Sequence, residues 1–572
     1  MKSVSPLNPL PPPWINITRL ESTPDRPQRL RLRGELGYRI TRCIHRLEHE
    51  LPYSREYLLS QVSGAAGQWS QFPRYHGDIA GRWVLALTWA HSDGPPPEHL
   101  RVIVAELLDL QNDDGSFGSI AFEEEPLNMH KAYGNGWMLK ALAQYAITFG
   151  DTTVAAAARR LGDFVDRTFH VWEEADTTEG GRDNYGVTRS CYFHSLDGLV
   201  TLHRLSGEQK YLDLAGKFIP LLTPLEDADH AHMYLTCRRG MLAWLDATDG
   251  DIGPLADELD RFRSLHCFET GGTPERVVQC EKHRSDPDRM HYDEACTLFD
   301  WELLTLRLHE LTGDVSWLQS AVLNLENQIF FNQQYSGGFG HSEFGPHYPM
   351  CQIEAPWCCT PFGPFGLLAA SAMMVARKGG ELLVRHLLSG DFDFGDGVIK
   401  LDRDDRAMCF KIRTAPSASP GIVRLATPFW LDVDRTVWDI PEDGELTIPF
   451  RYRVWASSWR QPPEQITQLT EHDSAVLFYG PWILAHRFSD PIPCVDLETD
   501  RAGFVTNARS DHLFGCGAWG ETVRLTLPSN HTTTTHDVSR GIRETSGALP
   551  MYPLRSKEDP RQLHTRVLLR RP

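Results

Sequence analysis

The sequence lacks the short motifs that mark the commonest nucleotide-binding and hydrolytic sites. It contains no phosphate-binding loop, no dinucleotide-binding glycine pattern that opens a β-α unit, no Gly-x-Ser-x-Gly elbow and no His-Glu-x-x-His pair. It also lacks the Cys-x-x-Cys spacing with which zinc fingers and zinc ribbons hold their ion. These absences give no support to a phosphate-loop or dinucleotide-dependent enzyme, a serine hydrolase, or a zinc finger or ribbon.

Long apolar runs and an excess of positive charge are absent as well. No stretch has the roughly 20 consecutive apolar residues of a transmembrane helix, and residues 1–13 have no apolar signal core. The net charge of -19 argues against nucleic acid or an anionic membrane as a partner. The 12 cysteines among 572 residues are too few for a disulfide framework, so we expect a reducing cytoplasm.

The middle of the chain has the pattern of consecutive helices. From about Leu36 to Arg377, apolar residues recur at three- and four-residue steps, and Gly-Asp or Ser-Gly pairs separate the segments. The junctions at residues 149–151 and 311–314 resemble each other, which indicates stacked helical hairpins. We therefore predict an (α/α)6 toroid with a concave site formed by the loops at one end.

The remainder of the chain differs in composition from this helical part. Residues 1–30 are proline-rich and are expected to be an irregular lead-in. After about Gly379, short runs rich in β-branched and aromatic residues alternate with turn residues, which is typical of antiparallel sheets. The predicted organisation is a multidomain α + β protein with a lead-in at 1–30, a helical toroid at 31–378 and β-sandwich domains at 379–572.

Three cysteines and one glutamate form a candidate metal site. Glu294 and Cys296 are separated by one residue, and Cys358 and Cys359 are adjacent. Three sulfurs and one carboxylate oxygen are one ligand set for tetrahedral zinc, Zn2+. The competing interpretation is that the cysteines are small buried apolar residues and that Glu294 is a charge at a helix start.

Other residues could act beside such a cluster. Glu281 is a candidate general acid and base, although a solvated surface glutamate is the simpler interpretation. His130, His194 and His230 lie on or beside helices, with Tyr292 and Trp357 among their aromatic neighbours. They could line a polyol-binding cavity, or they could belong to the core.

These segments resemble glycoside hydrolase family 127, the β-L-arabinofuranosidase family. Its paired Glu-x-Cys and Cys-Cys signature matches residues 294–296 and 358–359. Further similar segments are Asp229-His230-Ala231-His232 with Gly240-Met241, Thr270-Gly271-Gly272, and Gly480-Pro481. The similarity runs discontinuously from about Asp78 to Leu484.

The resemblance implies a retaining exo-glycosidase that cleaves a terminal furanoside, similar to a β-L-arabinofuranoside, in a small oligosaccharide or glycoside. The implied nucleophile is Cys358, which would hold zinc together with Glu294, Cys296 and Cys359. The implied acid/base is Glu281, with Glu275 as the alternative because the sequence around Glu281 departs from the family pattern. His130, His194 and His230 would contact the sugar.

Two other functions fit parts of the sequence. The first is another (α/α)6 carbohydrate enzyme, a polysaccharide lyase or a sugar epimerase, in which the cysteines are structural. The second is a non-catalytic sugar-binding protein with a structural zinc. The sequence does not fix the sugar, its linkage or the aglycone, and the β-rich half offers surfaces for a homodimer.

Overall fold

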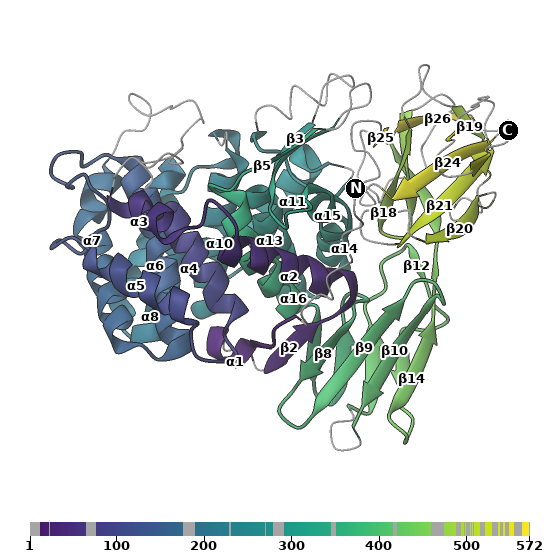
Figure 1. Ribbon diagram of the computed structural model, residues 1–572, viewed down its shortest axis with the longest axis horizontal. Helices are drawn as coiled ribbons and strands as arrows, with labels where there is room; N and C mark the ends of the chain where they lie inside the picture. Colours follow the sequence, from purple (N-terminus) through teal and green to yellow (C-terminus); the bar gives the residue numbers. More distant parts are fainter. Residues whose placement is uncertain are drawn as a thin grey trace, which may run out of the picture.

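The computed structural model describes most of the chain between residues 12 and 487, and a set of strands beyond. The described residues are 12–21, 23, 25–63, 76–174, 189–227, 230–268, 270–277, 291–344, 351–415, 420–458 and 474–487, with strands and a few other residues between 494 and 570. Helices occupy one side of the molecule and sheets the other (Figure 1). None of the described helices combines the length and the apolar composition that a membrane crossing requires.

Six helices form a closed inner ring in which each helix packs against the next and the last packs against the first. In ring order they are α4 (Asp78–Ala90), α6 (Met129–Phe149), α8 (Leu196–Ser206), α10 (Ala231–Ala247), α13 (Ala295–Thr312) and α16 (Cys359–Met373). Outer helices alternate with them along the chain, so the inner helices all run in the same direction. This arrangement confirms the predicted (α/α)6 toroid and gathers the N-termini of the six inner helices at one end.

The outer layer explains why the inner helices are apolar on all sides. It consists of α2 (Gly34–His49), α5 (Glu98–Asp109), α7 (Thr152–Glu173), α9 (Gln209–Phe218), α11 (Gly253–His266) and α14 (Val315–Leu323), with α3 (Arg55–Ser63) packed on α4 and α5. Every residue of α4 and of α16 is buried. A helix that is buried all round has no side facing solvent, so its sequence is mostly apolar, and the two charged residues of α4, Asp78 and Arg82, pair with each other.

A small sheet that the sequence did not predict lies at one end of the ring (Figure 1). Its strands are β3 (His291–Glu294), β4 (Gly340–Phe344) and β5 (Cys351–Glu354), in that order. We expected Asp293 and Glu294 to start a helix. They instead end a strand in which Glu294 pairs with His341, because α13 begins only at Ala295.

The helical side is followed by two sheets that share its core. One contains β8 (Gly390–Asp393), β9 (Val398–Asp404), β10 (Cys409–Thr414) and β14 (Glu445–Pro449). The other contains β6 (Val375–Lys378), β7 (Glu381–Val384), β11 (Ile422–Leu425) and β13 (Val437–Asp439). The inward-facing side chains of both sheets, such as Ile412 and Val423, belong to one hydrophobic cluster.

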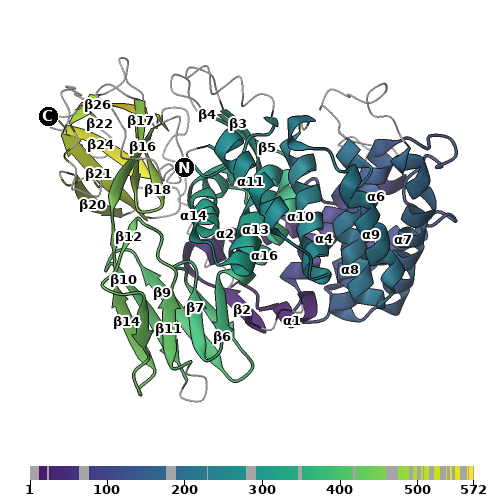
Figure 2. The same ribbon diagram turned by 180° about the vertical axis from the view of Figure 1, so that it is seen from behind.

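The lead-in contributes to this β region. Its strands β1 (Ile15–Asn16) and β2 (Arg29–Leu32) extend the first sheet, in which β2 pairs with β8 (Figure 1). Figure 2 shows the β region from behind, with β6, β7 and β11 of the second sheet. Residues 15–16 and 29–32 are therefore regular, where the sequence suggested an irregular segment. The division of the chain at residues 30 and 378 stays a prediction.

A third sheet includes the last described strands. It contains β17 (Ser474–Tyr479), β18 (Trp482–Arg487), β21 (Glu521–Pro528) and β24 (Ala548–Pro553). Asn327 of the helical side donates to the carbonyl of Pro481, and its side-chain oxygen accepts from the amide of Ile483. These two bonds attach the third sheet to the helices.

Candidate metal and active site

The residues predicted to carry the chemistry lie at or near the N-terminal end of the inner ring. His130 is in the first turn of α6, and His194 precedes α8. His230 caps α10, Cys296 is in the first turn of α13, and Cys358 precedes α16. Segments far apart in the sequence meet here because the six inner helices begin at the same end.

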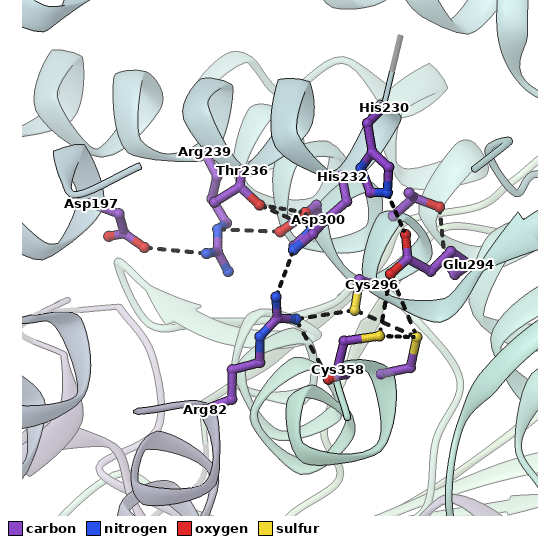
Figure 3. Close-up of polar contacts among 12 residues, drawn as sticks. Arg82, Asp197, His230, His232, Thr236, Arg239, Glu294, Cys296, Asp300 and Cys358 are labelled. Carbon is purple, nitrogen blue, oxygen red and sulfur yellow. Dashed lines mark hydrogen bonds and ion pairs between the residues drawn. The ribbon is translucent and has the colours of Figure 1, made fainter. Parts of the chain in front are cut away.

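The four predicted metal ligands converge on one point (Figure 3). The sulfur of Cys359 lies 3.6 Å from that of Cys296 and 3.4 Å from that of Cys358. The Oε1 atom of Glu294 lies 3.5 Å from the Cys358 sulfur and 3.7 Å from the Cys359 sulfur. Ligands about 2.3 Å from a tetrahedral ion lie about 3.7 Å apart, so the donor set and its spacing fit a metal ion.

The local backbone explains how Glu294 and Cys296 reach the same point although they are two positions apart. Glu294 has extended φ and ψ angles of -126° and 129° and ends β3, whereas Cys296 is already helical. On a regular helix their side chains would diverge. The change from strand to helix between them turns both side chains toward the cysteine pair.

The three cysteines differ in exposure and in acidity. Cys296 and Cys359 are completely buried, whereas Cys358 is partly exposed. Hydrogen bonds from the Cys296 and Cys359 thiols hold the pKa of Cys358 well below its usual range. Burial raises the pKa of both partner thiols and of the Glu294 carboxyl. Cys358 is therefore the sulfur that is both accessible and easily deprotonated.

Arg82 places a buried positive charge against this cluster (Figure 3). Its side chain is 1% exposed, and Nη1 donates to the Cys296 sulfur at 3.1 Å. Its Nε donates to Asp78 at 2.6 Å, and its guanidinium lies 4.3 Å from the centre of the Trp137 ring. Arg82 was not among the residues predicted from the sequence. The spacing of Asp78 and Arg82 indicates an ion pair within a helix, but it does not indicate that Arg82 also contacts the Cys296 sulfur.

A chain of buried polar side chains continues from Arg82 into the ring (Figure 3). Arg82 Nη2 lies 3.1 Å from His232 Nε2, and His232 Nδ1 lies 2.6 Å from an Asp300 oxygen. The other Asp300 oxygen lies 3.6 Å from Arg239, whose Nη2 reaches Asp197 at 3.4 Å. Burial raises the pKa of Asp300 to about 7.

His341 is a second contributor that the sequence analysis missed. Its Nδ1 lies 3.4 Å from Glu275, the alternative acid/base. Burial lowers the pKa of His341, but hydrogen bonds to Cys358 and Glu275 outweigh this effect and raise it to about 12. The same contact lowers the pKa of Glu275 despite its burial. The predicted acid/base, Glu281, lies outside the described residues.

The residues predicted to contact the sugar differ in their burial and in their contacts. His194 is 4% exposed, packs 4.3 Å from the Tyr133 ring and has no hydrogen-bond partner on either ring nitrogen within the described part of the chain. His230 Nε2 lies 3.3 Å from Glu294 Oε2. His130, Tyr292 and Trp357 are partly buried. The unpaired imidazole of His194 suits a ligand hydroxyl, because buried polar atoms normally have a partner.

Residues 26–233 match the family model of the β-L-arabinofuranosidase GH127 catalytic domain. This part of the helical ring is therefore similar to the catalytic domain of GH127 glycoside hydrolases. The matched residues include α4, α6 and α8 of the inner ring and end at the start of α10. No curated protein matches the sequence.

Solved GH127 structures share the fold over nearly the full length of the chain. A GH127 beta-arabinofuranosidase is 14% identical, with 99% of each chain covered and a TM-score of 0.64. A GH127 beta-L-arabinofuranosidase from Geobacillus stearothermophilus T6 is 14% identical, with 95% of this chain and 100% of the other covered and a TM-score of 0.65. At this identity the likeness establishes the GH127 fold, including the sheets that follow the helical ring.

Proposed function

We propose that this protein is a retaining exo-glycosidase that cleaves a terminal furanoside, similar to a β-L-arabinofuranoside, with Cys358 as nucleophile. One observation carries the proposal. Of three clustered sulfurs, only that of Cys358 is partly exposed, and its pKa is the one that is lowered. A nucleophile must be reachable and deprotonated, and the two buried sulfurs satisfy neither condition.

The proposed metal is zinc, held by Glu294, Cys296, Cys358 and Cys359. The donor chemistry supports this choice, because three thiolates and one carboxylate match the soft and borderline ligands that zinc prefers. When bound, zinc would keep the sulfurs deprotonated at neutral pH. Arg82 would offset part of the remaining negative charge through its contact with Cys296.

The proposed reaction has two displacement steps. The Cys358 sulfur attacks the anomeric carbon while Glu281 gives its proton to the departing oxygen, which breaks the glycosidic bond. The Glu281 carboxylate then takes a proton from water, and that water breaks the carbon–sulfur bond and releases the Cys358 thiolate. Two inversions at one carbon give overall retention.

We assign the role of general acid and base to Glu281 and not to Glu275 because of the charged group beside Glu275. A general acid must keep its proton near neutral pH, so its pKa should be raised. His341 lowers the pKa of Glu275, which suits a carboxylate that orients His341 rather than a proton donor. Glu275 therefore serves in this proposal as a positioning residue.

The sugar would bind above Cys358, between the inner helices that start at this end. His194 has two buried ring nitrogens without partners in the described region, and His230 is held by Glu294. His130, Tyr292 and Trp357 would complete the pocket. An exo-acting enzyme needs such an enclosed set of hydroxyl contacts around one terminal residue.

The decisive experiment compares two single-sulfur variants. The full-length protein and its Cys358→Ser and Cys267→Ser variants are assayed on a panel of aryl furanosides and pyranosides, with metal content measured on the same samples. Cys267 is the control because it is also partly exposed but lies outside the cluster. We expect zinc in the unmodified protein, retention in the product, and a loss of about 10^3-fold or more only for Cys358→Ser.

The alternative outcomes separate the competing functions. Normal turnover by Cys358→Ser would reject the nucleophile and favour an epimerase or a lyase with structural cysteines. Binding of glycosides without release of any sugar would favour a non-catalytic protein. An inverted product would also reject the two-step reaction.

A further inference from the structure

A cavity of ≈ 400 Å³ lies among the inner helices, away from the cysteines. Its walls include residues 239–247 of α10, 303–307 of α13 and 365–373 of α16, which are the C-terminal parts of these helices. Residues Glu21 and Arg26 of the lead-in also line it. The cavity therefore belongs to the opposite end of the ring from Cys358.

The cavity concentrates positive charge in a protein whose net charge is -19. The basic residues that line it are Arg26, Lys140, Arg204, Arg239 and Arg307, and the acidic ones are Glu21, Asp197 and Asp246. Some of these charges are matched: Arg26 pairs with Glu21, and Arg307 pairs with Asp246 at 2.6 Å. The excess of positive charge therefore lies with the remaining charged residues, Lys140, Arg204, Arg239 and Asp197.

Lys140 and Arg239 share the carboxylate of Asp197 at the cavity wall. Lys140 donates to Asp197 at 2.8 Å, and Arg239 lies 3.4 Å from its other oxygen. Figure 3 shows the pair formed by Arg239 and Asp197. Arg204 donates to the backbone carbonyl of Leu20 at 2.6 Å. Burial lowers the pKa of Lys140, and the charges of Arg204 and Arg239 lower it further. Arg239 also lies 3.6 Å from an oxygen of Asp300, which does not line the cavity. Within this group of cavity-lining residues, three cations accompany one carboxylate, so positive charge is in excess.

The cavity lining also contains apolar side chains, among them Leu242, Leu303, Phe365, Ala369 and Met373. The guanidinium of Arg239 lies 5.5 Å from the centre of the Phe365 ring, so charged and apolar lining residues meet there. A ligand that contacts both kinds of residue has an anionic group attached to an apolar one.

We propose that this cavity is a second binding site, for a phosphate monoester whose phosphate contacts Lys140, Arg204 and Arg239. A phosphate monoester carries about -1.5 to -2 charges at pH 7, which suits this excess of positive charge. Its ester group would lie against Phe365 and its apolar neighbours. Pockets of roughly 300–1,000 Å³ are typical for small ligands, so the volume also suits a compact ester. The proposal does not depend on the chemistry at Cys358.

The test is calorimetric titration of the full-length protein with phenyl phosphate and with inorganic phosphate at constant ionic strength set by sodium chloride. Two charge-neutralising variants are compared. Arg204→Gln removes a cation of the cavity, whereas Arg159→Gln removes an exposed arginine of α7 that pairs with Glu208 outside it. We expect saturable binding by the unmodified protein, with a higher affinity for phenyl phosphate than for inorganic phosphate. The affinity of Arg204→Gln for phenyl phosphate should be lower by about tenfold or more, whereas that of Arg159→Gln should be unchanged.

A second variant tests the same site without changing its charge. Ala243→Trp places an indole in the cavity that Ala243 lines, and we expect it to abolish phenyl phosphate binding. Absence of saturable binding by the unmodified protein would overturn the proposal. So would equal affinity of the unmodified protein, Arg204→Gln and Ala243→Trp. Failure of phosphate ester binding would not bear on the proposed glycosidase function, because that function is tested by the turnover of glycosides and its loss in Cys358→Ser.

Discussion

At the scale of single residues, Arg82 has the least obvious role in the cysteine cluster. Three thiolates and a carboxylate carry four negative charges, two more than a divalent ion supplies. Arg82 is a buried cation in direct contact with the Cys296 sulfur, and Asp78 and Trp137 fix its orientation. It is therefore placed to reduce the excess negative charge and to orient a metal ligand.

We predict that Arg82→Met lowers metal affinity by about 10- to 100-fold, as loss of a group that supports metal ligands commonly does. Arg82→Lys keeps the charge but not the forked donor geometry, so it should restore part of that affinity. Competition with a coloured zinc chelator measures the affinity, and the split between kcat and KM is measured on the active substrate.

The matched control is Arg238→Met. Arg238 is also buried and ion-paired on α10, but it binds Glu258 at 2.6 Å and lies over the Tyr234 ring. It should affect stability without changing metal affinity. Equal metal affinities of Arg82→Met and the unmodified protein would contradict the role given to Arg82.

At the scale of elements, the starts of α13 and α16 position the cluster, and the sequence located neither start correctly. Proline is unfavourable inside a helix, which favours a helix start at Pro364. The helix begins instead at Cys359 and contains Pro364. All of its residues are buried, so packing inside the ring outweighs the cost of the proline.

Close contact between the inner helices depends on glycines, and Gly136 shows the effect on the site. A methyl group at Gly136 of α6 would lie 2.9 Å from both His194 Nδ1 and the Ser195 amide. We predict that Gly136→Ala destabilises the protein by about 1–3 kcal/mol, because overpacking outweighs the better helix propensity of alanine. It should also weaken sugar binding by displacing His194.

The measurements for Gly136→Ala are urea unfolding and KM on the active substrate. The control is Gly253→Ala at the exposed start of α11, where the nearest atoms that a methyl group would meet belong to the Asp251 side chain. That variant should be neutral or slightly stabilising. A Gly136→Ala protein with unchanged stability and KM would show that the α6–α8 contact is adaptable.

At the scale of the whole molecule, Glu310 of α13 joins three parts of the chain. It pairs with Arg26 of the lead-in at 2.6 Å, with Arg307 of its own helix at 2.8 Å and with Arg385 after β7 at 3.0 Å. Burial raises the pKa of its carboxyl, but the charges of Arg26, Arg385 and Arg307 outweigh burial and lower it to about 2.

This lowered pKa predicts a pH-dependent contribution to stability. A folded-state pKa of about 2 against an ordinary value of 4.5 corresponds to about 3 kcal/mol. Because the folded pKa is the lower one, this stabilisation is complete above about pH 4.5 and is lost as the pH falls toward 2. Glu310→Gln should therefore be strongly destabilised at pH 7, and the difference from the unmodified protein should shrink toward pH 3.

Urea unfolding at pH 7, 5, 4 and 3 measures this difference. Glu56→Gln is the control, because Glu56 is exposed and lies 3.8 Å from Arg55 in a surface pair. Such pairs contribute about 0–1 kcal/mol, so that variant should follow the unmodified protein at every pH. A constant difference for Glu310→Gln between pH 7 and pH 3 would contradict the argument.

The sequence by itself determined the class of fold and the donor set of the candidate metal site. Helical periodicity followed by β-rich segments is a local pattern, and the Glu294-x-Cys296 and Cys358-Cys359 pairs are visible without any structure. The order of the helical hairpins also follows from the sequence, because Gly-Asp and Ser-Gly pairs mark their junctions.

Only the tertiary structure decided which residues meet these donors. Arg82 and His232 lie on helices far from the cysteines in sequence, and Asp300, although only four residues from Cys296, is of a side-chain type that is common throughout the protein. Their contacts arise because six parallel helices start at one end of a closed ring. The exposure that distinguishes Cys358 from Cys359 also depends on this packing, since the sequence does not show which of two neighbouring side chains is buried.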